Sequence, residues 1–239
     1  MGYVELEKEL NMHNRIFAVK RVNSEKAYVC DGECSIEALS QVFQGNETIF
    51  SAETSRCFGY QSNAGFKSGW PNVPGGIEYF LSCGRGVGFP PGERIKKNPE
   101  IAMEYFEHYD RDVLKPFNAY KVTPYTEGCD AEVVWMFANP DQLSALILLH
   151  EFRSSDSTDN FFVSFASGCG SLFAQPFAQL KAAHPKAVIG CTDVAARPYI
   201  DKNLLSLAVS NAKFKEMLAD TQDCFFHGIF WSKLKDRLK

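Results

Sequence analysis

The amino-acid sequence predicts a mixed β-sheet with packed helices, of the α+β or α/β class. Two apolar runs, residues 161–166 and 187–189, each lead into a glycine followed by a cysteine, and a helical stretch lies between them. This order is typical of a β-α-β unit, in which two parallel strands end at the same edge of the sheet. Because open α/β sheets bind ligands at the carboxyl ends of their strands, a site is expected there.

A second observation concerns the region from residue 65 to residue 92, which holds eight of the 17 glycines and four of the 11 prolines. So many residues that interrupt regular structure predict a long loop, with only a short helical piece inside it. Aromatic residues in the loop argue against a plain linker, so a lid and a structural cover both remain open. We expect a single domain over 1–239, with an N-terminal region, residues 1–64, and a C-terminal region, residues 98–239, that contains the β-α-β unit.

The N-terminal region is expected to hold two helices and three strands. The helices are predicted at 4–13 and 35–43, and the strands at 16–22, 27–30 and 48–53. Thr54 or Ser55 is expected to cap a further helix that places Cys57 in its first turn, where a thiol has a lowered pKa. Cys30 and Cys34 form a Cys-x3-Cys pair, which we interpret as a turn because no second pair follows to complete a zinc site.

The C-terminal region alternates strands and helices. Strands are predicted at 120–123, 132–138 and within 201–209, and helices at 98–109, 139–152 and 211–220, followed by a basic amphipathic helix at the end. Asn-Pro pairs supply the cap and first residue of the first two of these helices. Pro176 suits a first turn, but it should kink a helix that already begins after Ser171. The short connection before 201–209 leaves antiparallel pairing open.

Charge, apolar runs and cysteine content argue against several classes of function. The net charge is −4 with scattered lysines, which argues against a nucleic-acid partner. The sequence shows no secretory signal and no apolar run long enough for a membrane span, so we expect a cytoplasmic protein with no membrane partner. In a reducing compartment the eight cysteines are expected to be buried residues, metal ligands or nucleophiles rather than disulfides.

Several stretches resemble an archaeal and bacterial family called ArCR, domain of unknown function number one hundred and sixty-nine. They are Glu132–Phe137 with Asn139–Leu143, Gly168–Gly170, Ile189–Asp193 through Arg197–Tyr199, Glu216–Leu218 ahead of Trp231, and, more weakly, Cys57–Gly59. The resemblance is clearest in the C-terminal half. It implies that cysteines equivalent to 57, 169 and 191 recur in the family, but it implies no activity.

The first hypothesis is a redox-type metal protein that holds an iron–sulfur cluster. Its ligands would be Cys57, Cys169 and Cys191, with Cys83 as the fourth. Clusters need thiolates, surrounding backbone N–H donors and apolar shielding, which the glycine turns and nearby phenylalanines would supply. The wide spacings lack the tight Cys-x2-Cys-x2-Cys run, so only the fold could bring these thiols together.

The second hypothesis is a module or cofactor-free enzyme that binds a small anionic molecule. The turns at Gly168, Gly170 and Asp193 would offer N–H groups, and Arg197, Arg85 or Arg56 would clamp a carboxylate or phosphate. Cys169 is the best candidate for a nucleophile, but no histidine is identifiable as its base. A structural or interaction protein is a third class. The partner is a small-molecule ligand or a redox partner, and the oligomeric state and any catalysis remain open.

Overall fold

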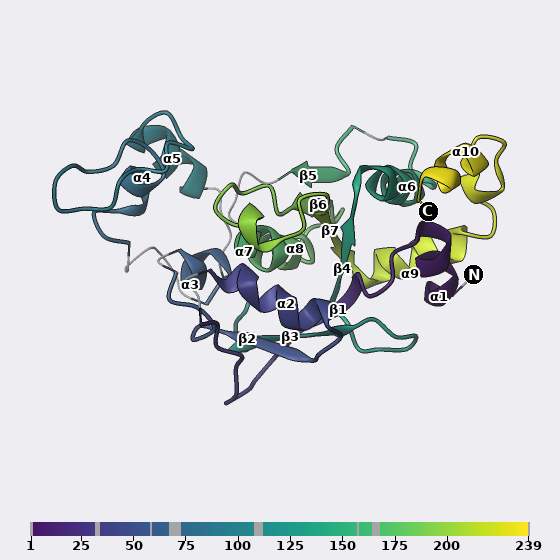
Figure 1. The fold of residues 1–239 in the computed structure, drawn as a ribbon, viewed down its shortest axis with the longest axis horizontal. Helices are drawn as coiled ribbons and strands as arrows, with labels where there is room; N and C mark the ends of the chain where they lie inside the picture. The colour runs from purple at the N-terminus through teal and green to yellow at the C-terminus, as the bar shows by residue number, and fades with distance from the viewer. Residues whose placement is uncertain are drawn as a thin grey trace.

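The computed structural model describes residues 2–31, 34–57, 59–66, 73–107, 112–156, 158–163 and 168–238. Its centre is a seven-stranded mixed sheet with the order β2-β3-β1-β4-β7-β6-β5. In that order the strands are Thr48–Ser51, Ala119–Pro124, Ile16–Val22, Val133–Ala138, Leu205–Ser210, Ala187–Gly190 and Phe161–Val163. Figure 1 shows helices on both faces of this sheet, which confirms the predicted class.

The central strand β4 explains why the sheet is covered on both sides. Successive side chains of a strand point to opposite faces of the sheet. All six residues of β4 are buried, so both faces of the sheet are covered at this strand. Trp135 and Phe137 belong to the hydrophobic core on one face, and Met136 and Ala138 to the core on the other. The buried indole of Trp135 also donates a hydrogen bond of 2.9 Å to the carbonyl of Leu172, which anchors helix α7 (Gly168–Leu172) to the strand.

The helices divide into two layers according to the core to which they contribute. The first layer consists of η1 (Ser35–Ala38), α2 (Leu39–Phe43), α3 (Tyr60–Asn63), α7 (Gly168–Leu172) and α8 (Ala174–Gln179). The second consists of α1 (Tyr3–Leu10), α6 (Pro140–Glu151), α9 (Asn211–Asp220) and α10 (Trp231–Lys235), with the short turns η3 (Phe225–His227) and η4 (Asp236–Leu238). A last short turn, η2 (Arg197–Tyr199), lies between β6 and β7.

The predicted β-α-β unit is present, since β5 and β6 pair in parallel with Phe161 opposite Ala187. Strand β6 then pairs antiparallel with β7, so the open question about the short connection is settled in favour of a reversal. The crossover contains two short helices rather than one, because the chain leaves helical geometry at Phe173, with φ −106° and ψ −83°. Pro176 therefore lies in the first turn of α8, where proline is tolerated.

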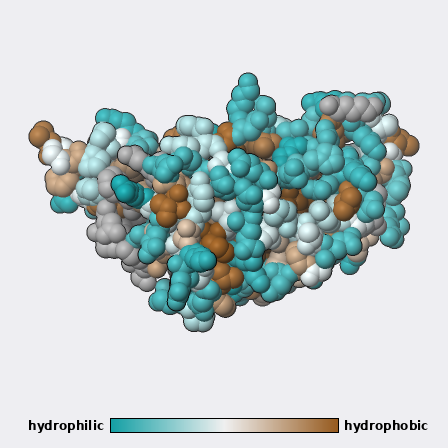
Figure 2. All heavy atoms as spheres, turned by 60° about the horizontal axis from the view of Figure 1, so that its bottom comes forward, coloured by the Kyte–Doolittle hydropathy of each residue, from teal (hydrophilic) through white to brown (hydrophobic). Residues whose placement is uncertain are grey.

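A small lobe formed by residues 73–107 projects from one end of the molecule (Figure 1). It contains α4 (Ile77–Phe80) and α5 (Pro99–Glu107), and it has a core of its own made of Val73, Ile77 and Phe106. Most of the predicted Gly/Pro-rich loop 65–92 lies in this lobe, while residues 67–72 lie outside the described ranges. Hydrophobic residues on the face in Figure 2 are scattered among hydrophilic ones, and some gather at the lobe's outer end.

Two local predictions were wrong. Residues 27–30 do not form a strand, although Tyr28 and Cys30 each donate a backbone hydrogen bond of 2.9 Å to the neighbouring segment, at Ile49 and Thr54. Cys57 does not lie in a helix, because α3 begins at Tyr60. The hydroxyl of Ser55 instead accepts the Cys57 N–H at 3.1 Å, so the serine closes a local turn and caps no helix.

Candidate functional site

The carboxyl end of β6 has an unusual backbone at Cys191, whose φ of 60° lies in the left-handed region. For a residue with a side chain this conformation is uncommon, and it needs support from its surroundings. The support comes from Ser171 on α7, whose hydroxyl accepts the Cys191 N–H at 3.0 Å and donates to the Gly168 carbonyl at 2.9 Å. Gly190 is required beside it, because an added Cβ there would overlap the Ser171 side chain.

The thiol of Cys191 is fully buried beside the hydroxyl of Ser206 on β7. Burial raises the pKa of this thiol to about 12, against the lowering effects of Ser206 and Arg197, while Asp193 and Cys34 raise it further. At neutral pH the group is therefore a protonated thiol. A protonated, enclosed thiol is a poor nucleophile, so its first role here is to fill the core at the strand end.

The Asp193 side chain is hydrogen-bonded to the backbone at Gly168. One carboxylate oxygen of Asp193 accepts the Gly168 N–H at 3.2 Å, and the other accepts the Ala195 N–H at 2.9 Å. The loop after β6 is thus fastened to the start of α7. The backbone N–H that was expected to bind an anion is committed to this carboxylate, and Gly170 is buried within α7.

The structure does not bring the four cysteines of the expected cluster together. Cys169 and Cys191 both contribute to the core on the first face, so they lie on one side of the sheet as the β-α-β order predicts. Cys34 packs against the same core and is an electrostatic neighbour of Cys57, Cys191 and Asp193. Cys83, in contrast, lies in the projecting lobe. Within the described ranges, which include all eight cysteines, no group of three or more His, Cys, Asp or Glu side chains is arranged to hold a metal ion.

Arg85 also lies in the lobe, where it has structural partners. Its guanidinium lies 5.0 Å from the ring centre of Tyr79 and 5.8 Å from that of Phe89, and it donates a 2.9 Å hydrogen bond to the carbonyl of Gly75. These contacts hold the lobe together. The structure therefore separates Arg85 and Cys83 from the other residues that the sequence singled out.

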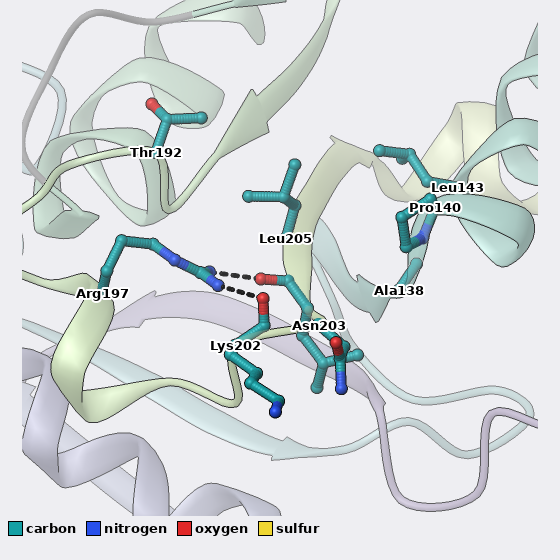
Figure 3. A pocket seen from close by; sticks show the side chains of 9 residues that line it. Ala138, Pro140, Leu143, Thr192, Arg197, Lys202, Asn203 and Leu205 are labelled. Carbon is teal, nitrogen blue, oxygen red and sulfur yellow. Dashed lines mark hydrogen bonds between the residues drawn. The ribbon is translucent and has the colours of Figure 1, made fainter.

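A pocket of about 530 Å³ opens at the edge of the sheet where β4 and β6 end and β7 begins. Strands β4 and β6 run in the same direction, since both pair antiparallel with β7, so their carboxyl ends share this edge. The walls are mostly apolar, and the polar groups come from the loop after β6 (Figure 3). The lining residues are Ala138, Pro140, Leu143, Thr192, Arg197, Lys202, Asn203, Leu204 and Leu205.

Arg197 shapes this pocket. Its guanidinium donates to the backbone carbonyls of Lys202 at 2.7 Å and Leu204 (Figure 3). It also donates to the carbonyl of Asp201 at 3.2 Å, and these bonds hold the loop 201–204 closed on itself. Carbonyl groups carry no net charge. Within the described stretches of the chain neither Arg197 nor Lys202 forms an ion pair with a carboxylate, so both leave positive charge at the pocket.

Sequence reasoning identified Arg197 but missed Lys202 and Thr192. Thr192 follows Cys191 directly, so the rule that ligands bind at the carboxyl ends of strands could have pointed to it. Lys202 gave no signal, because an exposed lysine in a loop is ordinary until the fold places that loop at the edge of a pocket. The sequence pattern predicts only a turn at Cys34, and the fold brings this thiol within electrostatic range of Cys57 and Cys191.

The fold and the site together define a three-layered α/β protein with a ligand-sized pocket at the carboxyl ends of β4 and β6. The chain belongs to the family DUF169, described as Uncharacterised ArCR, which matches residues 5–220. No curated protein and no solved structure matches the chain. Among the residues that the structure describes, no helix is long and apolar enough to cross a membrane.

Proposed function

We propose that this protein binds a small molecule that carries an anionic group and an apolar body, in the pocket between β4, β6 and β7. The observation that supports this most is the composition of the lining. Two cations, Arg197 and Lys202, and no Asp or Glu are among the nine lining residues, while Ala138, Pro140 and three leucines form apolar walls. A volume of about 530 Å³ is in the range of small-molecule sites.

Helix α6 adds to the positive character of the pocket. Its first residue, Pro140, and the nearby Leu143 line the hollow, so the N-terminal end of a twelve-residue helix faces it. The helix dipole places partial positive charge at that end, which favours an anion. Arg197 would contribute mainly charge, because its hydrogen bonds to the loop carbonyls fix its position. Lys202 is exposed and has the freedom to approach a ligand.

The iron–sulfur cluster expected from the sequence is not included in this proposal. The expected ligand Cys83 lies in the lobe, and the described thiols do not come together in a group of three. The described residues therefore do not fit such a cluster as arranged. No catalytic step is assigned to the pocket either, since the adjacent Cys191 thiol is protonated and enclosed.

The test is a thermal-shift titration with two matched pairs of probes, hexanoate with hexanamide and phenylacetate with phenylacetamide. A ligand that binds only the folded state raises the melting temperature, and the stabilisation grows with the ratio of its concentration to its Kd. The carboxylates should stabilise the wild type more than their neutral amides. The Lys202→Glu variant should lose that difference. The Lys215→Glu variant, with the same charge change at an exposed position of α9, should keep it.

Two results would contradict the proposal. Equal shifts for each carboxylate and its amide would show that charge is not recognised. An undiminished preference for the carboxylates in Lys202→Glu would place the anion away from this pocket. If the carboxylates are preferred as expected, a series of carboxylates of increasing chain length would measure how much of the apolar wall the ligand contacts, at about 0.8 kcal/mol for each CH₂ that becomes buried.

A further inference from the structure

Two chain segments that carry cysteines run side by side at the margin of the first helical layer. The Tyr28 N–H donates to the carbonyl of Ile49, and the Cys30 N–H donates to that of Thr54, both at 2.9 Å. These two bonds align the segment that leads to Cys34 with the segment that leads to Cys57. Cys34 and Cys57 follow these bonded residues within a few positions, and Cys57 is close enough to Cys34 to act on it electrostatically.

The two thiols of this pair differ in exposure. Cys57 is exposed, whereas Cys34 is half-buried, precedes η1 and packs against the core on the first face. Among the charged groups around Cys34, Cys57 has the largest effect, followed by Asp193 and Cys30. The pair therefore consists of one thiol open to reagents and one enclosed thiol beside it.

The surrounding packing holds both segments in place. The Tyr60 N–H donates to the Cys57 carbonyl at 3.2 Å, and Tyr60 itself is fully buried. On the other side, Ile36 lies against Gly168, where an added Cβ would come within 3.2 Å of it. The two cysteines are thus fixed to packed elements, η1 and α3, rather than carried on long free loops.

We propose that Cys57 and Cys34 form a reversible disulfide with each other when the protein meets a low-molecular-weight disulfide, which makes this margin a redox-modification site. The proposal is independent of the anion pocket. It differs from the cluster hypothesis, because it needs two thiols and no metal, and because one of the two, Cys34, belongs to none of the predicted ligand sets.

The chemistry proceeds in two exchange steps. The Cys57 thiolate attacks one sulfur of the small disulfide, so a Cys57–S bond forms, the original S–S bond breaks, and one small thiolate leaves. The Cys34 thiolate then attacks the Cys57 sulfur and displaces the second small thiolate. The two protons from the cysteine thiols go to the two small thiolates. One protein disulfide and two small thiols result, so the small disulfide is reduced and the protein is oxidised.

The test treats the whole reduced protein with oxidised glutathione and maps its cysteines by mass spectrometry of peptides under non-reducing conditions. In the wild type we expect an intramolecular Cys34–Cys57 linkage that dithiothreitol reverses. In Cys34→Ser the second step is blocked, so a glutathione adduct should accumulate on Cys57. Cys83 is the internal control, because it is an exposed thiol in the lobe, away from this pair. It should carry a stable adduct in every variant.

Three outcomes would overturn the proposal. One is a Cys57 adduct that is as stable in the wild type as in Cys34→Ser. A second is linkage of Cys57 to a different cysteine. A third is linkage between two protein molecules in place of the intramolecular product, which gel filtration and non-reducing electrophoresis would reveal. Peptide mapping of the wild type needs no variant, so the proposal stays testable even if Cys34→Ser folds poorly.

Discussion

The hydroxyl of Ser171 on α7 accepts the backbone N–H of Cys191 at the end of β6, at 3.0 Å. This hydrogen bond joins the two ends of the β-α-β unit, since α7 follows β5 and Cys191 follows β6. Both residues are fully buried, so water cannot replace either partner. The left-handed backbone at Cys191, and with it the path of the loop that lines the pocket, depends on this contact.

Replacement of Ser171 by alanine should therefore destabilise the fold. The Cys191 N–H would be left buried without its acceptor, which costs on the order of 1–3 kcal/mol. Denaturant unfolding monitored by circular dichroism would measure the loss. Ser40→Ala is the matched control, because Ser40 is exposed, and its free energy of unfolding should change by less than about 0.5 kcal/mol. A loss equally small for Ser171→Ala would show that the hydrogen bond does not support the turn.

Replacement of Arg197 by lysine should loosen the loop 201–204. An ammonium group is a point donor and cannot reproduce the planar guanidinium that reaches three carbonyls. We expect a loss of about 1–2 kcal/mol in the free energy of unfolding and faster amide hydrogen exchange in the loop. Arg56→Lys, at an exposed position, should leave both unchanged. Unaltered exchange in Arg197→Lys would mean that the loop is held by other contacts.

Much of the fold could be predicted, because local chemistry and tertiary packing agree over most elements. The cap-and-proline start of α6 and the strictly apolar β4 are examples in which one pattern determines one structure. Residues 27–30 show the opposite case. The segment looks like a strand, but it makes only isolated hydrogen bonds, one to Ile49 within β2 and one to Thr54 after it, and sequence alone cannot tell two such bonds from continuous pairing.

The site was harder to predict than the fold, because it depends on which residues long-range packing brings together. Gly190 and Cys191 did mark the end of β6, but Gly168 to Gly170 begin helix α7 instead of forming a turn, and the Gly168 N–H is bound by Asp193 rather than by a ligand. Cys83 looked equivalent to the other cysteines in sequence. Cys83 is separated from the other cysteines because the lobe folds around a core of its own, and no local sequence pattern predicts that core.

Cys191 should also make the protein less stable in alkaline solution. Burial raises the pKa of its thiol from 9.0 to about 12, so the folded state holds the proton over a range in which the unfolded state releases it. The contribution of this thiol to the free energy of unfolding is therefore fully present below pH 9. It decreases by about 1.4 kcal/mol per pH unit as the pH rises toward 12. The groups that face the thiol are Ser206, Arg197, Asp193 and Cys34.

The measurement for this prediction is the free energy of unfolding from pH 7 to pH 11. The Cys191→Ser variant should show a shallower decline than the wild type, because a hydroxyl does not titrate in this range. Cys83→Ser removes an exposed thiol and should leave the slope unchanged. Other buried groups with raised pKa values, Cys34 and Tyr60 among them, keep a residual slope in every variant. Identical slopes for Cys191→Ser and the wild type would contradict the assignment.

Closure of the proposed Cys34–Cys57 disulfide should accelerate steeply with pH. Burial raises the pKa of the Cys34 thiol to about 11, and the negative charge of Asp193, which remains when Cys57 carries the adduct, adds to the effect. Only the thiolate attacks, so the rate of the second exchange step should rise about tenfold per pH unit between roughly pH 7 and 10. Acid quenching followed by mass spectrometry would follow the conversion of the Cys57 adduct into the disulfide.

Asp193→Asn offers a sharper form of the same test. The amide keeps one oxygen for the Ala195 N–H and gives up the 3.2 Å bond from the Gly168 N–H. It also removes the negative charge that acts on Cys34, so the pKa of that thiol should fall and closure at pH 8 should quicken severalfold. Asp223→Asn, with the same charge change at an exposed position, should close at the wild-type rate. A closure rate that levels off near pH 8 in the wild type would show that the attacking thiol is not the enclosed, protonated Cys34. An unchanged rate in Asp193→Asn would show that this carboxylate does not act on the attacking thiol.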